Sequence, residues 1–280
     1  MFCLFTLGCV KCYGPRALNV MPETSEPFVL SWPHYLEKPD GRLYLSVKAA
    51  IDGSASLLLL IVTAPLLLLA IVLVKLTSRG PALYCQTRLG LNGRPFTIFK
   101  VRTMAHGCES LTGARWSTPG DARVTTVGRW LRKTHIDELP QLVNVLRGDM
   151  SLVGPRPERP EFVPKLEKAI PRYRHRLVVR PGVTGLAQVQ LPADTDIDSV
   201  RTKLAYDLFY LDNVGFWLDV RLCWATALKL TGVSFRTIRS LFLFPSREAI
   251  ERASNMPLAR VQANPSAALR DFRPAVAKVY

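Results

Sequence analysis

The polarity pattern is dominated by one uncharged stretch of 22 residues, which lies between Asp52 and Lys75. As a straight helix it would measure about 33 Å, enough to cross the hydrocarbon core of a bilayer. Pro65 lies at its centre, where a proline removes one backbone hydrogen bond and clashes with the carbonyl of Ile61, so we expect a bend there. Thr63 could bond a carbonyl freed at that bend.

Positive charges flank this stretch on both sides, with Arg42 and Lys48 before it and Lys75 and Arg79 after it. Since lysine and arginine favour the cytosolic side of a membrane, neither flank is typical of an extracytoplasmic segment. A helix that dips into the bilayer and returns to the same side fits the length, the proline and the charges. A simple spanning anchor fits the length as well, so the pattern leaves both open.

Beyond the apolar stretch, the pattern predicts two strands followed by two helices. Gly80-Pro81 breaks the chain, residues 82–86 have the composition of a short strand, and residues 95–102 alternate in polarity. Residues 121–131 lead into a short helix.

The second helix is better marked. Its apolar positions fall at i, i+3, i+4 and i+7, namely Leu139, Leu142, Val143 and Leu146. Pro140 in the first turn and Gly148 at the end are typical of the two helix termini. Asp137 and Glu138 are therefore expected at the positive end of this helix.

Residues 200–231 mix aromatic, apolar and basic side chains at helical spacing, for example Trp217 and Trp224 near Arg221 and Lys229. This composition is typical of a helix lying in the head-group layer of a membrane. An ordinary core helix has the same periodicity, so that alternative stays open.

The length and net charge of the chain limit its possible domain organisation and partners. The 280 residues allow one catalytic body with extensions, and the formal net charge of +15 favours anionic partners. Six cysteines without a framework indicate a reducing compartment. We expect a disordered N-terminal extension at 1–42, a membrane helix segment at 43–80, a catalytic domain at 81–231, and a C-terminal helix and basic tail at 232–280.

The adjacent carboxylates of Asp137 and Glu138 are the first candidates for catalytic or metal-binding residues. An isolated Asp before a helix is usually an N-cap. Two neighbouring carboxylates repel each other unless a cation joins them, and the arginines and lysine around this pair indicate Mg²⁺ or an anionic ligand nearby.

Arg156 stands between Pro155 and Pro157, which fix the backbone on either side, so its guanidinium is suited to hold a phosphate. A surface turn is the alternative. Other cations could extend this pocket or form a solvated face: Arg88, Lys100, Arg102 and Arg159. His135, as a lone histidine, favours a structural role over a catalytic one.

These residues belong to a longer series of motifs through which residues 43–231 resemble the bacterial sugar transferase family, the monotopic phosphoglycosyl transferases. The motifs are Lys48 with Asp52, Gln86-x-Arg88-x-Gly90, Lys100-Val101-Arg102-Thr103-Met104, Asp121-x-Arg123, Leu131-Arg132-Lys133-Thr134, Asp137-Glu138-Leu139-Pro140-Gln141, Asn144-Val145, Gly148-Asp149-Met150-Ser151-Leu152-Val153-Gly154-Pro155-Arg156-Pro157, and Arg180-Pro181-Gly182-Val183-Thr184-Gly185-Leu186-Ala187-Gln188-Val189.

The resemblance implies a small α/β membrane-associated catalytic domain with an N-terminal re-entrant helix and interfacial amphipathic helices. It implies transfer of a sugar 1-phosphate from a UDP-sugar to polyprenyl (undecaprenyl) phosphate, with release of UMP, as the initiating step of exopolysaccharide or related glycan synthesis. Asp137 would attack the sugar-bearing phosphorus and carry a covalent sugar phosphate, and Glu138 would assist catalysis and hold Mg²⁺. The substrate-binding residues implied are Lys100, Arg102, Arg156, Pro157, Arg88 and Gln188.

The implied partners are a UDP-sugar, polyprenyl phosphate and anionic membrane lipids, without nucleic acid, and a homo-oligomer is left open. The implied location is the bacterial inner (cytoplasmic) membrane, with the catalytic domain on the cytosolic face. Neither the sugar nor the length of the lipid follows from the sequence.

Three departures from the family pattern bear on these expectations. Ala64-Pro65 stands where the family has Ser-Pro, and His135 replaces a small hydroxyl residue. The segment Gln188-Val189-Gln190-Leu191-Pro192 lacks the Asn-Gly-Arg that often follows. An anion-binding arginine is thereby missing, and Arg180 or Arg201 could replace it.

The alternative function is a catalytically inactive, membrane-anchored scaffold that binds anionic lipid or nucleic acid through its charge. The intact Asp137 and Glu138 argue against inactivity, and the sequence has no recognisable nucleic-acid module.

Overall fold

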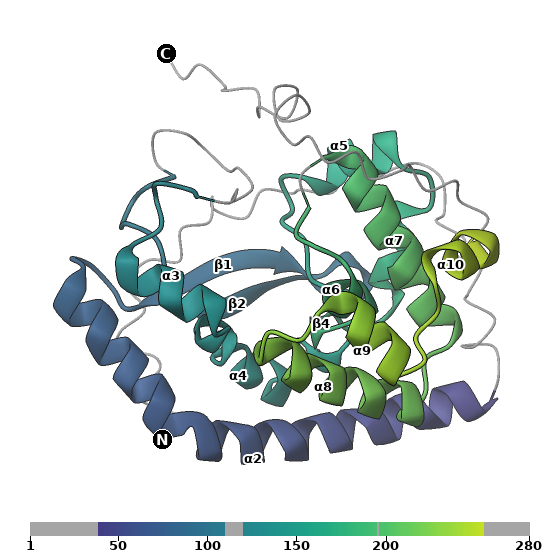
Figure 1. The fold of residues 1–280 in the computed structure, drawn as a ribbon, viewed down its shortest axis with the longest axis horizontal. Coiled ribbons are helices and arrows are strands. Elements are labelled where there is room, and N and C mark those ends of the chain that lie inside the picture. Colours follow the sequence, from purple (N-terminus) through teal and green to yellow (C-terminus); the bar gives the residue numbers. More distant parts are fainter. Residues whose placement is uncertain (1–38, 110–119, 195, 255–280) are drawn as a thin grey trace.

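The computed structural model describes residues 39–109, 120–194 and 196–254 (Figure 1). The predicted extension therefore lies outside the described residues up to residue 38, as does the predicted tail beyond residue 254. The described residues form a body of helices and short strands, and one long apolar helix packs against this body.

The first described element is the helix α2, Pro39–Thr77, which contains Pro65. Figure 1 shows that α2 is bent, with its two arms running along adjoining edges of the same body. Thr63 does not bond the Ile61 carbonyl, which lies one turn before Pro65, because its hydroxyl donates to the Leu59 carbonyl at 2.7 Å. The hydroxyl reaches back one turn, as it does in an unbroken helix.

Both arms of α2 are fastened to the body. On the first arm, Lys48 pairs with Asp219 at 2.6 Å, and Ser151 donates to Asp52 at 2.5 Å. On the second arm, Ala70 and Val74 are buried in an apolar cluster with residues of the body. Among the described helices, the stretch Leu43–Thr77 is the one long and apolar enough to cross a membrane, and most of its best apolar window is exposed.

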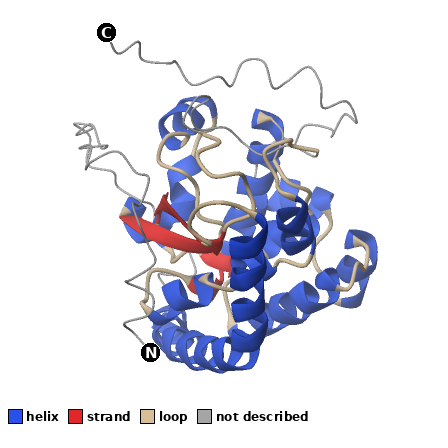
Figure 2. Cartoon of the chain, turned by 90° about the vertical axis from the view of Figure 1, so that its left-hand side faces the viewer, coloured by secondary structure: helices blue, strands red, loops and turns tan. Residues whose placement is uncertain are grey.

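The two strands predicted after α2 are confirmed. β1, Leu83–Leu89, and β2, Pro95–Val101, form an antiparallel pair in which Arg88 lies opposite Phe96 and Tyr84 opposite Lys100. The short 3-10 turn Leu91–Gly93 connects them, and its left-handed Asn92 and Gly93 close the hairpin. Figure 2 shows the strands flanked by helices.

Two short helices follow the hairpin, as predicted. α3 is Thr126–Lys133 and begins at a Thr125 cap, and α4 is Gln141–Leu146. Between them the chain makes the 3-10 turn Ile136–Glu138, which His135 enters with a left-handed φ of 54°. The two carboxylates therefore lie in a separate turn just before α4, rather than inside its first turn.

A second sheet was not predicted. β3, Ser151–Val153, pairs in parallel with β4, Gly182–Thr184. Gly154 lies at the crossing, where a Cβ would come within 2.6 Å of the Arg180 carbonyl oxygen, so only glycine fits without a backbone shift. Between these strands lie α5, Val163–Ala169, and the 3-10 helix η4, Tyr173–Val178.

The C-terminal part is helical: α6 is Leu186–Gln190, α7 is Ile197–Asp212, α8 is Phe216–Leu230, α9 is Phe235–Leu241 and α10 is Arg247–Ser254. Residues 200–231 thus form most of two helices. The sequence left open whether this region is a core helix or a surface helix, and the structure gives a different answer for each of the two. α7 is a core helix, with Leu204, Ala205 and Leu211 at 1% exposure or less. α8 is amphipathic, with Trp217 and Trp224 exposed on its outer face.

Candidate active site

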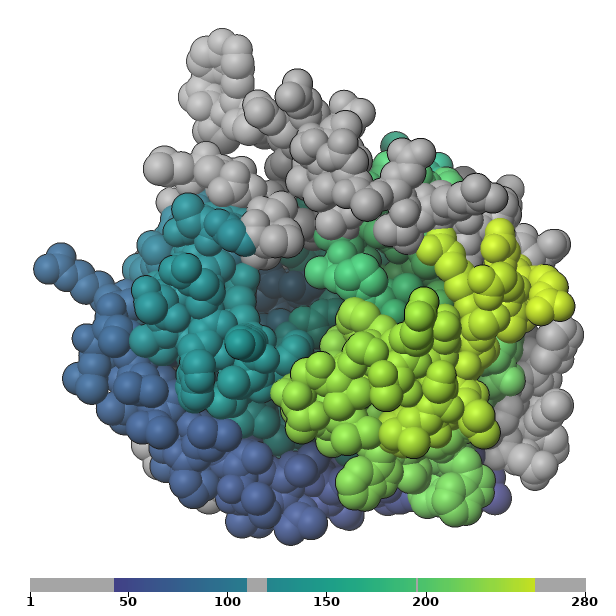
Figure 3. Space-filling view, viewed as in Figure 1, coloured from purple at the N-terminus to yellow at the C-terminus, as the bar shows by residue number. Residues whose placement is uncertain are grey.

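The surface of the body is hollowed between α3 and α4 on one side and the C-terminal helices on the other (Figure 3). Asp137 and Glu138 belong to the short turn between α3 and α4. Asp137 is 7% exposed, and Glu138 is partly buried. The buried apolar side chains of Ile136 and Leu142 on either side fix this turn on the body.

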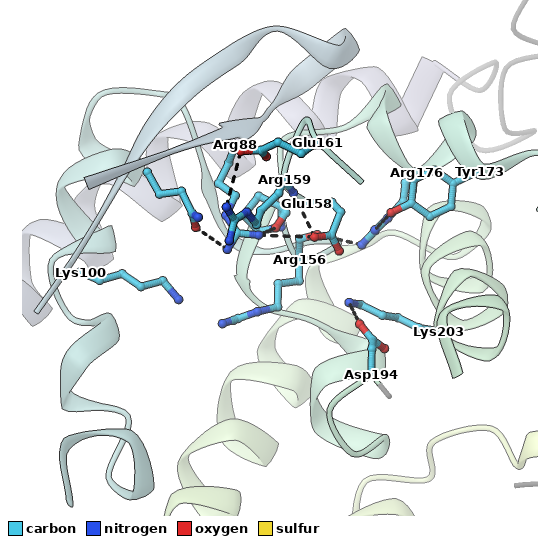
Figure 4. A network of polar contacts seen from close by, with 12 residues as sticks. Arg88, Lys100, Arg156, Glu158, Arg159, Glu161, Tyr173, Arg176, Asp194 and Lys203 are labelled. Atoms are coloured by element: carbon cyan, nitrogen blue, oxygen red, sulfur yellow. Dashed lines mark hydrogen bonds and ion pairs between the residues drawn. The ribbon is translucent and has the colours of Figure 1, made fainter. Parts of the chain in front are cut away.

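Glu138 is held by two cations from different elements. Lys100 of β2 donates to Glu138 Oε1 at 2.9 Å, and Arg156 donates to both carboxylate oxygens, reaching Oε2 at 3.1 Å. In Figure 4, the side chains of Lys100 and Arg156 point toward a common space. The hairpin and the loop after β3 therefore meet at this carboxylate.

The two neighbouring carboxylates titrate in opposite directions. Burial, followed by the charge of Glu138, raises the pKa of Asp137 to about 6. Burial would also raise the pKa of Glu138, but Arg156 and Lys100 together hold it well below its ordinary value. At neutral pH both groups are thus ionised, but only Glu138 is neutralised by hydrogen-bonded cations.

The backbone that carries Arg156 is held by two further arginines. Arg176 of η4 donates to the Arg156 carbonyl at 2.8 Å, and Arg88 of β1 donates to the Pro157 carbonyl at 3.1 Å. Arg176 also pairs with Asp207 of α7 at 2.8 Å, and both side chains are 3% exposed. Figure 4 shows Arg88, Arg156 and Arg176 in one continuous polar network.

Of the predicted cationic residues, the structure brings together Lys100, Arg156 and Arg88. Arg102 is directed elsewhere, since its guanidinium bonds the carbonyl and hydroxyl of Ser78 just after α2. Arg159 pairs with Glu109 at 3.0 Å and with Glu161 at 3.5 Å. Of these four cations, Lys100 and Arg88 thus contact Glu138 and the Pro157 carbonyl, whereas Arg102 and Arg159 bond Ser78, Glu109 and Glu161.

Pro157 and Gln188 take part mainly through their backbone carbonyls. The Pro157 carbonyl accepts from Arg88, and the side-chain amide of Gln188 donates through Nε2 to the Val183 carbonyl at 2.8 Å. The Gln188 carbonyl in turn accepts from Lys229 of α8 at 2.5 Å. His135 stands at the start of the carboxylate turn, and partial burial lowers its pKa, with Lys229 and Arg156 among the charges that act on it.

Three residues that matter to this arrangement were missed by the sequence reasoning: Arg176, Asp207 and Lys229. Arg176 and Asp207 lie in segments where charged residues are frequent, so the sequence carried no signal that they pair. Lys229 was noticed only as a basic residue on an aromatic helix. Its contact with Gln188 spans 41 positions and depends on the packing of α6 against α8.

For a metal, the described residues offer no group of three or more His, Cys, Asp or Glu side chains. Asp137 and Glu138 supply two adjacent carboxylates, whose hard oxygens Mg²⁺ prefers. Magnesium usually binds through one or two carboxylates, with waters and substrate phosphates completing its coordination. The carboxylate pair fits that mode, and the mutual repulsion that raises the pKa of Asp137 would be relieved by a bound cation.

Comparisons with known proteins agree with the sequence motifs. The family model described as bacterial sugar transferase matches residues 43–232. A UDP-glucose:undecaprenyl-phosphate glucose-1-phosphate transferase of Caulobacter vibrioides is 48% identical over 185 residues, which cover 65% of this chain and 69% of that protein.

Two longer relatives extend beyond the matched region. A UDP-N-acetylgalactosamine-undecaprenyl-phosphate N-acetylgalactosaminephosphotransferase of Aeromonas hydrophila is 43% identical, over 69% of this chain and 46% of its own length. An undecaprenyl-phosphate glucose phosphotransferase of Komagataeibacter xylinus is 45% identical, over 78% of this chain and 39% of its own length. The chain thus spans less than half of these two relatives.

Proposed function

Because the chain belongs to the bacterial sugar transferase family, we propose that it transfers a sugar 1-phosphate from a UDP-sugar to polyprenyl phosphate and releases UMP. The observation that carries this proposal is the carboxylate turn in the surface hollow, where an ionised Asp137 lies beside a Glu138 held by Lys100 and Arg156. Such an arrangement suits phosphoryl transfer, in which positioning and charge stabilisation supply most of the catalysis.

In the first step, a carboxylate oxygen of Asp137 attacks the sugar-bearing phosphorus of the UDP-sugar. The bond from that phosphorus to the bridging oxygen breaks, and UMP leaves with the bridging oxygen. With a pKa of about 6, Asp137 is largely ionised at neutral pH and keeps the basicity that a nucleophile needs.

In the second step, a phosphate oxygen of the polyprenyl phosphate attacks the same phosphorus. The acyl phosphate bond breaks, the aspartate carboxylate is regenerated, and a polyprenyl diphosphate sugar is released. No proton need be transferred in either step when the acceptor is a dianion.

The two cations beside Glu138 account for binding of the diphosphate. Lys100 and Arg156 already point into the hollow, so a diphosphate could exchange for part of their contact with Glu138. Arg156 suits this role, because its guanidinium can bond two phosphate oxygens at once. Glu138 would then keep both cations oriented when the site is empty of substrate.

We also propose that Asp137 and Glu138 hold Mg²⁺ when the donor is bound. The ion would neutralise charge on the diphosphate. UMP release should therefore stop when a chelator removes free divalent ions, and return when Mg²⁺ is added in excess of the chelator. Activity that persists after exhaustive chelation would contradict this part of the proposal.

The bent α2 supports a re-entrant placement at the cytosolic face of the inner membrane. Lys48 on its first arm and Val74 on its second arm both contact the same polar body. A straight spanning helix would carry one end to the opposite side of the bilayer, away from that body. A re-entrant helix leaves the hollow beside the membrane, where it could meet a soluble nucleotide sugar and a lipid phosphate.

The deciding experiment measures UMP release by the purified full chain from a panel of UDP-sugars, including UDP-glucose and UDP-N-acetylgalactosamine, with undecaprenyl phosphate as the acceptor. Incubation with the donor alone, followed by mass spectrometry, should find a hexosyl phosphate on the tryptic peptide that contains Asp137. Absence of UMP release from every donor would reject the transfer reaction and favour the scaffold. UMP release without the adduct would reject the covalent step alone.

A further inference from the structure

Lys229, near the end of α8, is an unusual lysine within the described structure. The other lysines with well-buried side chains have carboxylate partners there: Lys48 pairs with Asp219, Lys100 with Glu138 and Lys203 with Asp194. Lys229 is half-buried, yet no described carboxylate lies within ion-pair distance of it. A partly desolvated cation that forms no ion pair with a carboxylate favours an anionic ligand.

The ammonium of Lys229 is nevertheless held in place. It donates to the Gln188 carbonyl at 2.5 Å and lies 5.1 Å from the centre of the Phe235 ring. An ammonium has three donors, and these contacts leave it able to bond an oxyanion. The side chain is therefore fixed in position without being neutralised.

The contact with Gln188 ties Lys229 to the backbone that carries Arg156. Gln188 donates to Val183 of β4, and β4 pairs with β3, which leads directly into the Pro155-Arg156-Pro157 loop. The Gly154 amide donates to Thr184, and the Gly182 amide donates to the Pro155 carbonyl, which locks the two segments together. Burial, and then the charge of Arg156, lowers the pKa of Lys229, while the charge of Glu138 raises it, so Lys229 lies within electrostatic range of both residues.

Lys229 belongs to a helix with exposed apolar side chains, whereas Lys100 belongs to the hairpin. Trp224 and Leu230 on α8 are 65% and 48% exposed, and Leu241 and Leu243 after it are 62% and 81% exposed. An acceptor that carries a phosphate on a long hydrocarbon chain would present its charge from that side.

We propose that Lys229 binds the phosphate of the lipid acceptor, and so defines an acceptor subsite separate from the diphosphate contacts of Lys100 and Arg156. This inference rests on the proposed transfer reaction. Lys229 also places a cation next to Gln188, where this sequence lacks the Asn-Gly-Arg that often follows the same glutamine and valine in the family. Neither Arg180 nor Arg201 is needed for that purpose.

The test compares Michaelis constants for the two substrates in the full chain. Lys229→Gln should raise the KM for undecaprenyl phosphate roughly 10-fold or more, because a charge-assisted hydrogen bond to the phosphate is lost. The KM for the UDP-sugar should change less than about twofold. Lys229→Arg should largely restore acceptor use, since a cation returns to the position.

Arg236→Gln is the matched control. Arg236 lies exposed on the neighbouring α9 and carries the same charge, so its removal reports general attraction of anionic lipid. An equal loss of acceptor affinity in this variant would overturn the subsite.

The outcomes separate this inference from the proposed function. If the wild-type chain releases no UMP, the transfer reaction itself fails. If the wild type is active and Lys229→Gln keeps the wild-type KM for undecaprenyl phosphate, the subsite is wrong. If the KM for the UDP-sugar rises instead, Lys229 serves the donor diphosphate and the assignment to the acceptor is overturned.

A binding measurement on an Asp137→Asn background removes turnover from the test. Adding Lys229→Gln should weaken binding of undecaprenyl phosphate and leave binding of the uncharged undecaprenol unaffected. Equal weakening of both would indicate a loss of packing instead of a lost phosphate contact, and would count against the proposal.

Discussion

At the residue scale, the most informative contrast is between two neighbours of like charge. Asp137 is buried without a hydrogen-bonded cation and has a raised pKa, whereas Glu138 is bonded by Lys100 and Arg156 and has a lowered one. The first carboxylate is thereby more basic than an ordinary aspartate, and the second stays ionised at a lower pH than an ordinary glutamate. Adjacent positions in the chain can serve different purposes when they face different elements of the fold.

Asp137→Asn should abolish UMP release and stabilise the fold at neutral pH. Asp137 has a pKa of about 6 when folded and 3.8 as its ordinary value, so ionising it opposes folding as pH rises between these values. The stability difference between variant and wild type should therefore be full above about pH 6 and vanish below about pH 4. Thermal unfolding of both proteins across that range measures it.

The wild-type chain provides the matching kinetic observation. The rate of UMP release at low donor concentration should fall as pH drops below about 6, because the protonated carboxyl is no nucleophile. If Asp137→Asn released UMP at the wild-type rate, the role assigned to Asp137 would be wrong. If the difference in melting temperature between variant and wild type did not change with pH, its assigned ionisation would be wrong.

At the scale of elements, the loop after β3 depends on a buried ion pair between η4 and α7. Asp207 orients Arg176, and Arg176 donates to the carbonyl of Arg156. Since Arg156 also holds Glu138, the helix α7 helps to position the loop that carries Arg156. This is a positioning role, which kinetics can separate from a purely structural one.

Asp207→Leu alone should destabilise the fold by about 3–5 kcal/mol, because it leaves the buried Arg176 without a counter-charge. The double variant Asp207→Leu, Arg176→Met should regain most of that stability, since no buried charge remains. Its KM for the UDP-sugar should still be raised roughly 10-fold, because the Arg156 carbonyl has lost its donor. Chemical denaturation measures the stability, and steady-state kinetics measure the KM. If the double variant had both the stability and the KM of the wild type, the pair of Asp207 and Arg176 would have only a structural role.

The bent α2 predicts that its two flanks lie on one side of the membrane. Single cysteines at Val47 and at Leu76, in a chain whose own cysteines are replaced, should be labelled by the same impermeant reagent from the same side. Both positions are exposed, so lack of labelling would not reflect burial in the body. Labelling from opposite sides would restore the spanning anchor.

Elements with a readable period in polarity could be predicted from the sequence, and those without one could not. The apolar positions of α4 and the alternation of β2 gave those elements within a few residues. β3 and β4 have three residues each, too few to show a period, and their pairing joins segments about thirty residues apart. The break at Gly215 between α7 and α8 interrupts a pattern that is apolar on both sides.

The site was predictable where the chemistry is local. The carboxylates and the proline-flanked arginine are visible as short motifs, and the structure brings them together. Arg102 could not be excluded by spacing, because its direction depends on Ser78 beyond the end of α2. Lys229 and Asp207 could not be included, because their contacts arise only when the C-terminal helices pack.

At the scale of the whole molecule, the proposed membrane placement gives a net charge of +15 and a long exposed apolar helix the same partner. In that placement, charge would attract the chain to anionic lipid over a short range, and the apolar surface would hold it after contact. The two contributions differ in their response to salt.

The purified full chain should remain bound to neutral phosphatidylcholine vesicles in about 1 M salt, where charges are screened beyond about 3 Å. Addition of anionic lipid should increase binding only at low salt. A variant with Leu58→Glu and Leu68→Glu should be released from neutral vesicles, because both leucines are more than 60% exposed on α2. Sedimentation of vesicles measures each case, and salt-induced release of the wild type would mean that charge alone holds it.

The ion pair between Lys48 and Asp219 also has a consequence for biosynthesis. The ribosome adds Asp219 171 residues after Lys48. At typical bacterial elongation rates, that interval lasts roughly 9 to 34 s. During this time the nascent α2 has no body to pack against, so its leucine-rich surface needs the membrane or a targeting factor before translation ends. If α2 enters the membrane as proposed, its insertion would therefore precede folding of the body that packs against it.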